Sequence, residues 1–397
     1  MKKHSEFQLG DIATFIRGIN FKPDDVVKLD VPNAVACMRT KNVQSVLDLS
    51  DVWAVDRKFV KRDEQFLRDG DILVSSANSW NLVGKCCYID NIPYVSSFGG
   101  FVSVIRPTSE KIIPRFLYHW FASDIIQTKV RSFGRQTTNI SNLDLTRCLE
   151  LPLSLPSHDE QRRIAAILDK ADAIRRKRQQ SLKLTGDLVK SQFIEMFGGG
   201  EHFPQKQLHE VALISGGLTK NASKRVNYEL KIPYLRVANV FFNRLDLTEV
   251  LTLSVHPNEL GKGLLQAGDL LFVEGNGSIE QVGRVAIWDG SIQPCVHQNH
   301  LIKVRFNPGV MNPRFAMFFF MGDAGRAQIM GKAVSTSGLH TLSVNKIETL
   351  SIPLPPIELQ NQFAAFVEQA DKSKFAMQNQ LSEIEKLSSA LKQTFFA

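Results

Sequence analysis

The stretch LSLPSHDEQRRIAAILD at residues 153–169 returns in shorter form as IPLPPIELQ at residues 352–360. Both copies pass from apolar residues through proline into a polar segment that contains glutamine. In the first copy, residues 157–160 match a capping box, in which Ser and Glu side chains bond the free N–H groups of a helix's first turn. In the second copy, Pro356 stands where the first turn of a helix tolerates proline. Each copy therefore predicts the point at which a domain ends and a helix begins.

The two copies belong to a longer internal repeat. A shift of 199 residues aligns Gly84 with Gly283, Pro114-Arg115-Phe116 with Pro313-Arg314-Phe315, Gln161 with Gln360, and Ala171-Asp172 with Ala370-Asp371. Nearer the N-terminus the shift becomes slightly smaller, as short loop insertions would cause. This period exceeds the roughly 20–50 residues of solenoid repeats. The chain therefore contains one large unit used twice.

Each unit combines a module with a helix. Residues 1–155 and 203–355 contain short apolar stretches interrupted by Gly, Asn and Pro, a pattern typical of mixed α/β modules with short strands. Residues 156–202 and 356–397 have the periodicity of long helices. The sequence therefore predicts an α+β fold in which two mixed α/β modules are separated by two long helices, with pseudo-two-fold symmetry.

Both helices carry an apolar seam at alternating spacings of three and four residues, which is typical of coiled coils. The second seam is predicted at Phe363, Phe366, Ala370, Ser373, Met377, Gln380, Ile384, Leu387, Leu391 and Thr394. The first is predicted at Ile164, Ile167, Ala171, Ile174 and Leu188, flanked by Leu168, Leu182, Val189, Phe193 and Met196. Because a module lies between the helices along the chain, an antiparallel coiled coil preserves the symmetry.

Composition restricts the class of protein. The chain has 397 residues, 43% of them hydrophobic and 22% charged, so it can form two cores. Its formal net charge of +8 favours an acidic partner such as nucleic acid. The five cysteines form no C-x-x-C pair, which fits a reducing compartment. The start of the chain does not read as a secretion leader, and no apolar run is long enough for a membrane span. We expect a cytoplasmic protein without a membrane partner.

The proline-rich exit, the Glu160-Gln161 pair and the long helix that follows, all present in duplicate, resemble the specificity subunits of type I restriction-modification enzymes. The second copy departs by having Leu359 between Glu358 and Gln360. The resemblance covers essentially the whole chain. It implies that residues 1–155 and 203–355 are target-recognition domains and that the helices form the spacer between them.

The resemblance also implies a function and a set of partners. Such a subunit reads a bipartite, non-palindromic site on double-stranded DNA and has no catalytic residues. It recruits two methyltransferase subunits, which transfer a methyl group from S-adenosylmethionine to adenine N6, and motor-nuclease subunits. The cofactor is expected in the methyltransferase and not in this chain. Two alternatives are a self-contained methyltransferase or nuclease, and a coiled-coil interaction protein that binds no DNA.

The motifs of catalysis are missing from the sequence. The nearest match to the adenine-methyltransferase motif [DN]-P-P-[YF] is residues 91–94, Asn-Ile-Pro-Tyr, which lack the first proline. No nucleotide-binding P-loop motif occurs. The cluster around His297 contains zinc-binding residue types but has no second cluster nearby, so we expect no metal site.

Polar residues that suit DNA recur in both modules. Arg suits guanine or phosphate, and Asn pairs with adenine through two hydrogen bonds. The candidates are Arg39 and Asn42 with their counterparts Arg236 and Asn239, the loop residues Arg135, Thr137, Asn139, Lys332 and Ser335, and His297 with Asn299. For the repeated Arg-x-x-Asn motif, the alternative is a structural role in which Arg ties a strand to a neighbouring carboxylate.

Overall fold

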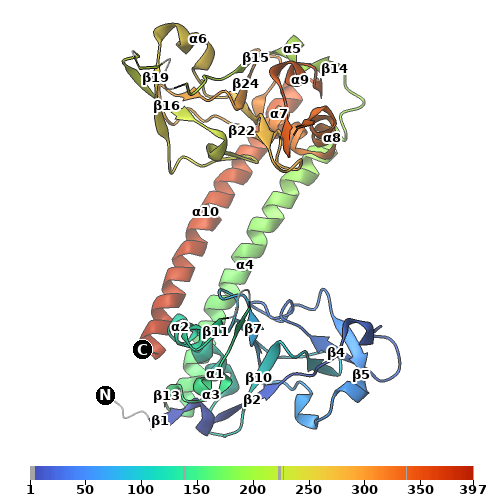
Figure 1. The fold of residues 1–397 in the computed structure, drawn as a ribbon, viewed down its shortest axis with the longest axis vertical. Coiled ribbons are helices and arrows are strands. Elements are labelled where there is room, and N and C mark those ends of the chain that lie inside the picture. The colour runs from blue at the N-terminus through green and yellow to red at the C-terminus, as the bar shows by residue number, and fades with distance from the viewer. Residues whose placement is uncertain (1–4, 137–139, 222–224, 227, 337, 397) are drawn as a thin grey trace. The chain divides into compact units, whose positions relative to one another are not determined.

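The structure is a computed structural model, and it describes every residue except 1–4, 137–139, 222–224, 227, 337 and 397. The chain forms two compact units (Figure 1). Unit 1 comprises Met1–Gln180 and Met377–Ala397, and unit 2 comprises Ser181–Ala376. Each unit therefore contains one module and about half of each long helix, α4 (His158–Phe197) and α10 (Ile357–Phe396).

The described residues of the unit 1 module form three small sheets and one strand pair. The strands of the first sheet, in spatial order, are β2 (Ala13–Arg17), β10 (Val102–Pro107), β6 (Ile72–Ser75) and β8 (Cys86–Tyr88). Those of the second are β3 (Val26–Val27), β5 (Trp53–Asp56), β4 (Ala34–Met38) and β9 (Ser96–Phe98). Those of the third are β11 (Arg135–Gln136), β12 (Ser141–Asn142) and β7 (Ala77–Asn78). β1 (Ser5–Gln8) pairs with β13 (Pro152–Leu155), which closes the module just before α4. The helices are α1 (Pro114–Phe121), α2 (Asp124–Ser132) and α3 (Leu145–Leu149).

The module of unit 2 repeats this order. Its first sheet contains β15 (Ala212–Gly216), β24 (Leu301–Phe306), β20 (Leu270–Val273) and β22 (Val285–Ile287). The second contains β19 (Leu251–Val255), β16 (Leu230–Leu235) and β23 (Val296–His297). The third contains β21 (Gly275–Asn276), β26 (Leu339–Thr341) and β25 (Val334–Thr336), and β14 (Gln205–Gln207) pairs with β27 (Ser351–Pro353). A further pair joins β17 (Val240–Phe241) to β18 (Arg244–Leu245). The helices are α5 (Leu208–Val211), α6 (Leu260–Gly263), α7 (Pro313–Met321), α8 (Asp323–Lys332) and α9 (Val344–Glu348). The predicted internal repeat of mixed α/β modules is confirmed.

The ends of α4 follow from its sequence. The Ser157 hydroxyl accepts a hydrogen bond from the Glu160 backbone N–H at 3.4 Å, as the capping box predicts. At the other end Gly198 has φ = +57°, the left-handed conformation that terminates a helix and that glycine adopts without strain. None of the described helices is both long enough and apolar enough to cross a bilayer.

Inside each unit the two long helices run antiparallel. In unit 2 the Phe193 ring, near the end of α4, lies 5.2 Å from the Phe363 ring, near the start of α10. In unit 1 Leu168, near the start of α4, belongs to the core against which Leu391, near the end of α10, packs. The predicted antiparallel pairing is therefore confirmed inside each unit.

The predicted seam is wrong at alternate positions. Ser388 is only 8% exposed, whereas Leu387, which was assigned to the seam, is 61% exposed. Likewise Val189 is buried and Leu188 is 53% exposed. A seam with alternating spacings of three and four residues can begin with either spacing. The two seams that result have every other residue in common. Hydrophobicity favours leucine over serine at 387–388, but the geometry of the helix selects the serine.

A phenylalanine pair joins each module to the far end of one long helix. Phe116 of α1 lies 5.5 Å, ring to ring, from Phe396 at the end of α10. Phe315 of α7 lies 4.7 Å from Phe197 at the end of α4. The two pairs are equivalent under the repeat, and both are edge-to-face contacts, the geometry that aromatic rings prefer. The module of unit 1 is thus completed by the C-terminal end of the chain.

A buried glutamine joins each module to the start of a helix. Gln161 is fully buried, and its side-chain oxygen accepts from the Ile113 backbone N–H at 2.8 Å. Its amide donates to the carbonyl oxygens of Lys111 (2.9 Å) and Pro156 (3.0 Å). Gln360 makes the equivalent bonds in unit 2, to the Asn312 N–H at 2.8 Å and to the carbonyls of Val310 and Pro355 at 3.3 and 2.8 Å. We call these two sets of contacts the glutamine joints.

Ion pairs strengthen both joints. Arg115 bonds Asp169 of α4 at 2.7 Å, and its counterpart Arg314 bonds Asp371 of α10 at 3.0 Å. The buried His119 also bonds Asp169, at 2.7 Å. Burial lowers the pKa of His119 more than the hydrogen bond to Asp169 raises it. The helix therefore contacts its module through paired polar groups as well as through apolar packing.

Replacement of Gln161 by leucine should destabilise unit 1, because three backbone groups would lose their partner inside the protein. A buried group left unsatisfied costs about 1–3 kcal/mol. We expect a drop of several degrees in the melting temperature of Gln161→Leu and of Gln360→Leu, measured by calorimetry. Gln179→Leu, at an exposed site of α4, is the matched control. Equal melting of Gln161→Leu and the control would contradict the role of the joint.

Candidate nucleic-acid interface

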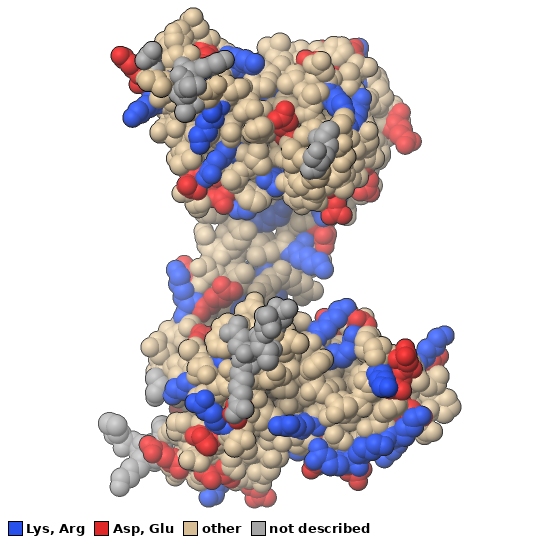
Figure 2. Space-filling view, viewed as in Figure 1, with Lys and Arg blue, Asp and Glu red and all other residues tan. Residues whose placement is uncertain are grey.

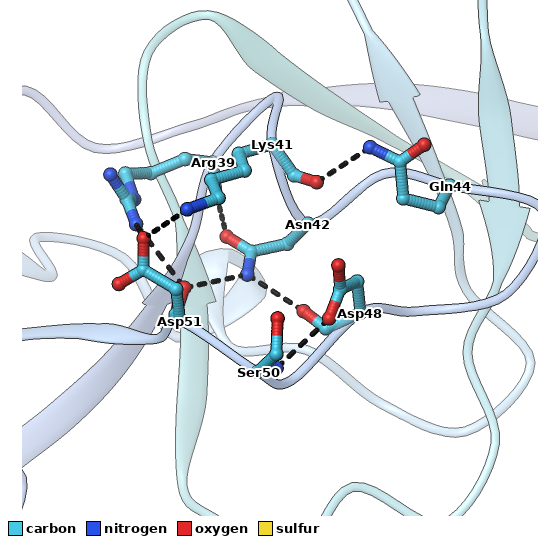
Figure 3. A network of polar contacts seen from close by, with 7 residues as sticks. All are labelled: Arg39, Lys41, Asn42, Gln44, Asp48, Ser50 and Asp51. Atoms are coloured by element: carbon cyan, nitrogen blue, oxygen red, sulfur yellow. Dashed lines mark hydrogen bonds and ion pairs between the residues drawn. The ribbon is translucent and has the colours of Figure 1, made fainter. Parts of the chain in front are cut away.

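The Arg-x-x-Asn motif of unit 1 forms a closed polar network just after β4 (Figure 3). Asn42 is 1% exposed, and its side-chain oxygen accepts from the Arg39 backbone N–H at 2.8 Å. Its amide donates to the carbonyl oxygens of Asp48 (2.7 Å) and Asp51 (3.0 Å). Both amide hydrogens of Asn42 are therefore used to hold residues 42–51 in a loop.

Arg39 completes this network. Its guanidinium bonds the Asp51 carboxylate at 3.0 Å and lies over the Trp53 ring at 3.8 Å. Lys41 bonds the same carboxylate at 2.7 Å. Hydrogen bonds from Lys41 and Arg39 hold the pKa of Asp51 below its ordinary value. Arg39 thus ties the end of a strand to a neighbouring carboxylate, which is the structural alternative named for this motif.

Unit 2 repeats the arrangement. The Asn239 side-chain oxygen accepts from the Arg236 N–H at 2.9 Å, and its amide donates to the carbonyls of Asp246 and Glu249 at 2.7 and 3.0 Å. Arg236 also pairs with the Glu249 carboxylate. Asn239 is 3% exposed. Base contact by Asn42 and Asn239 was therefore predicted wrongly, because a base cannot reach buried donors that are already bonded. The two arginines are partly exposed, so phosphate contact by them stays a prediction.

His297 is another candidate that the fold removes from the surface. It is fully buried on β23, and its Nδ1 lies 2.9 Å from the Gly263 carbonyl oxygen. Burial lowers its pKa to about 4. The equivalent residue in unit 1 is Phe98, which occupies the same place beside the parallel neighbouring strand. The prediction that His297 contacts DNA is wrong, since the side chain belongs to the core.

The remaining candidates lie near the third sheet of each module. Arg135 is on β11, and Ser335 is on β25. Lys332 ends α8, and its ammonium group donates to the Thr349 hydroxyl at 2.8 Å. Asn299 is half-buried in the turn before β24. Thr137 and Asn139 lie outside the described residues.

These candidates gather around one turn in each module. In unit 1 the turn is residues 99–101, where the Phe101 carbonyl accepts from the N–H groups of Ser76 (3.0 Å) and Ala77 (3.2 Å), next to β7. In unit 2 the turn is residues 298–300, and the His300 carbonyl accepts from the Glu274 N–H at 3.0 Å. We call the third sheet together with this turn the hairpin face.

Two exposed aromatic residues that no motif indicated lie in or beside the hairpin face of unit 1. Phe101 is 64% exposed, and Trp80, whose ring lies against Gly134 just before β11, is 45% exposed. In unit 2 His300 is exposed and bonds Glu274 at 2.8 Å. A signal for Phe101 was present in the sequence, because the repeat aligns it with a residue of different chemistry, His300.

Surface charge alone does not delimit the interface. Figure 2 shows Lys and Arg gathered along the lower edge of unit 1, below β4 and β5, while both signs of charge are interspersed over most of the visible face. An exposed basic run, Arg57, Lys58, Lys61 and Arg62, follows β5. Within the described part of the chain, no three His, Cys, Asp or Glu side chains are grouped as a metal site.

Known proteins share both the sequence and the fold. The family model of the type I restriction modification DNA specificity domain matches residues 1–184 and 201–386. The EcoKI specificity subunit of Escherichia coli K12 is 26% identical over 96% of this chain and 85% of its own length, and the StySPI specificity subunit of Salmonella potsdam is 24% identical over the same shares. The crystal structure of the type I restriction-modification S subunit from M. genitalium superposes with a TM-score of 0.61 at 14% identity, over 100% of this chain and 97% of that one. A structure from work on complex assembly of the type I R-M system gives a TM-score of 0.58 at 17% identity, over 100% and 98%.

The structural role of Asn239 can be measured. In Asn239→Ala the Asp246 and Glu249 carbonyls and the Arg236 N–H lose their partner, which should destabilise unit 2 by about 1–3 kcal/mol for each buried group left unsatisfied. We expect a lower melting temperature and, in the folded protein, an unchanged base preference. Asn258→Ala, at an exposed position of the same unit, is the control. A normal melt with an altered base preference would restore the base-contact prediction.

The buried His297 should make unit 2 sensitive to acid. In the unfolded chain histidine binds a proton near pH 6.5, but in the folded unit it does so only at about pH 4. Its contribution to stability is therefore present above pH 6.5 and lost as the pH falls toward 4, by about 2 kcal/mol at pH 5. His297→Phe, which copies Phe98, should remove this part of the loss.

Thermal melts at pH 7.5 and pH 5 measure the effect, with His202→Phe at an exposed position as the control. Equal acid sensitivity of wild type, His297→Phe and His202→Phe would show that the buried histidine is not its source.

Proposed function

Because the chain belongs to the family of type I restriction-modification DNA specificity subunits, we propose that it reads a bipartite, non-palindromic site on double-stranded DNA for a methyltransferase-nuclease complex. The family model covers both halves of the repeat. The chain is accordingly a non-catalytic DNA-recognition subunit. A self-contained methyltransferase and a coiled-coil protein that binds no DNA are not favoured.

The observation that carries the proposal is the contrast between the two modules. They share sheet order, glutamine joint and aromatic pair, so each presents its hairpin face on the same scaffold. The faces themselves differ, since Phe101 stands where unit 2 has His300. Two modules that share one scaffold but expose different side chains are suited to recognising two different half-sites. The long helices connect the two modules and serve as the spacer between them.

The outer surfaces of the long helices support recruitment of other subunits. Leu188 and Leu387 are equivalent under the repeat and are 53% and 61% exposed. Other large apolar side chains exposed on these helices are Ile174, Leu184, Ile194 and Phe375. Exposed apolar groups of this kind mark interaction sites when they gather on one surface. Equivalent positions in both units suit two copies of one partner.

We assign these positions to two methyltransferase subunits that modify adenine N6. S-adenosylmethionine is the methyl donor and is bound by those subunits, not by this chain. Motor-nuclease subunits then complete the complex. The proposed place of action is the cytoplasm, where the DNA is found.

Methyl transfer should require the partner. The purified chain should transfer no methyl group from S-adenosylmethionine to DNA, and transfer should appear when the methyltransferase subunits of its host are added. Methylation-sensitive sequencing of DNA treated with the complex should then show one bipartite site with two different halves. Transfer by this chain alone, with contamination excluded, or methylation without any bipartite site, would contradict the proposal.

A further inference from the structure

We propose that Phe101 reads a thymine in the half-site of the first module by contacting its C5-methyl group. The inference rests on the proposed function, because it takes double-stranded DNA as the ligand of the hairpin face. It names one residue and one chemical group on a base, which family membership alone does not supply.

The turn that carries Phe101 is held by the backbone around it. The Phe101 carbonyl accepts two hydrogen bonds from residues 76 and 77, and the Val102 N–H donates to the Gly99 carbonyl at 2.8 Å. A Cβ atom on Gly18 would lie 2.3 Å from the Gly99 carbonyl oxygen, so another segment of backbone passes very close to the start of the turn. The turn follows β9, and the Gly99 N–H joins it to the end of the neighbouring strand β4 by donating to the Met38 carbonyl at 2.9 Å. Phe101 is therefore presented from a rigid site.

The side chain itself points away from the core. Phe101 is 64% exposed, although burying a phenylalanine fully is worth roughly 1.5–3 kcal/mol. Single exposed apolar residues are common on protein surfaces and need no explanation. Here, however, Trp80, two residues after β7 and close to Gly134 before β11, is also 45% exposed. Unit 1 therefore presents two large aromatic residues to solvent, one in the hairpin face and one beside it.

Unit 2 provides an internal comparison. Its turn has the same backbone bonds, from Glu274 N–H to the His300 carbonyl at 3.0 Å and from Leu301 N–H to the Gln298 carbonyl at 2.9 Å. At the position of Phe101 it has His300, which pairs with the Glu274 carboxylate at 2.8 Å. An apolar residue and a hydrogen-bonded polar pair thus occupy equivalent places on equivalent scaffolds. Both side chains are exposed, so packing of the core does not require the difference, and we attribute it to the ligand.

The chemistry of DNA identifies what an apolar reader can recognise. In the major groove each base pair presents donors and acceptors, and the thymine C5-methyl is the apolar group among them. Apolar side chains, Phe included, contact that methyl group. Phosphates would not select an aromatic ring, because they favour cations and hydrogen-bond donors. Phe101 therefore fits a thymine, while the polar turn of unit 2 fits a different base edge.

The test removes the methyl group from the DNA and the ring from the protein. The complex with methyltransferase subunits is titrated, at one salt concentration, with duplexes in which each thymine of the mapped site is replaced in turn by deoxyuridine. Deoxyuridine lacks only the C5-methyl. At one position in one half-site, wild type should bind the uracil duplex about fourfold more weakly than the thymine duplex. This is the difference expected from burying one methyl-sized group. Phe101→Ala should bind thymine and uracil duplexes equally at that position.

Two further variants keep the test specific. Phe242→Ala removes an exposed phenylalanine, 37% against 64%, from the other unit and should discriminate at that position as wild type does. Phe101→Leu keeps an apolar side chain and should retain part of the discrimination. Melting temperatures near that of wild type show that the variants fold.

Several outcomes would overturn the inference. One is a mapped site in which no thymine shows the wild-type discrimination. Another is a Phe101→Ala complex that binds every duplex equally more weakly, which would indicate stacking or a general contact. If the complex methylates no bipartite site at all, the proposed function fails first and the reading role of Phe101 falls with it.

Discussion

The contact on which the rest of the structure depends is the buried glutamine at the start of each long helix. From its place in the helix, its oxygen and its amide together satisfy one N–H and two carbonyl groups from two other places: the loop before α1 or α7 and the proline exit. A buried amide is stabilising only when such partners are present, since each group left unpaired costs free energy. The geometry therefore permits one arrangement of module on helix. In each unit this arrangement fixes the orientation of the module, and with it the hairpin face, on the helix.

The residues that the repeat preserves most clearly lie at this joint. The Pro-Arg-Phe segments of both copies place an arginine that pairs with the helix and a phenylalanine that packs on the end of the other helix. The ion pairs differ in detail, because Arg115 selects Asp169 whereas Arg314 selects Asp371. Both solutions keep a guanidinium bonded to a carboxylate on the helix. Small changes of this kind are tolerated because the glutamine fixes the contact.

The interior of the modules has diverged more than their topology. Val104 of unit 1 is replaced by Lys303, which is 4% exposed and donates to the carbonyls of Lys262 and Leu264, both at 2.9 Å. Burial lowers the pKa of Lys303 to about 8. His297, which replaces Phe98, contacts the Gly263 carbonyl in the same segment. Lys303 and His297 of unit 2 thus make hydrogen bonds to residues 262–264, whereas Val104 and Phe98 at the equivalent positions of unit 1 pack in an apolar core, and the same sheets accept either solution.

Sequence alone determined the duplication, the two helices, their limits and the membership of the family, because these depend on periodicity and on local rules of capping and chain termination. Only the tertiary structure decided which residues face inward. Hydrophobicity placed Leu387 in the seam, but the helix turns Ser388 toward its partner. Composition made Asn42, Asn239 and His297 suitable for DNA, but the fold uses their hydrogen-bonding groups internally, which a residue type cannot reveal. Phe101 had no motif at all. Its exposure results from a turn held by residues 76 and 77, about 25 positions earlier in the chain, and contacts between segments so far apart are set by packing and not by local sequence.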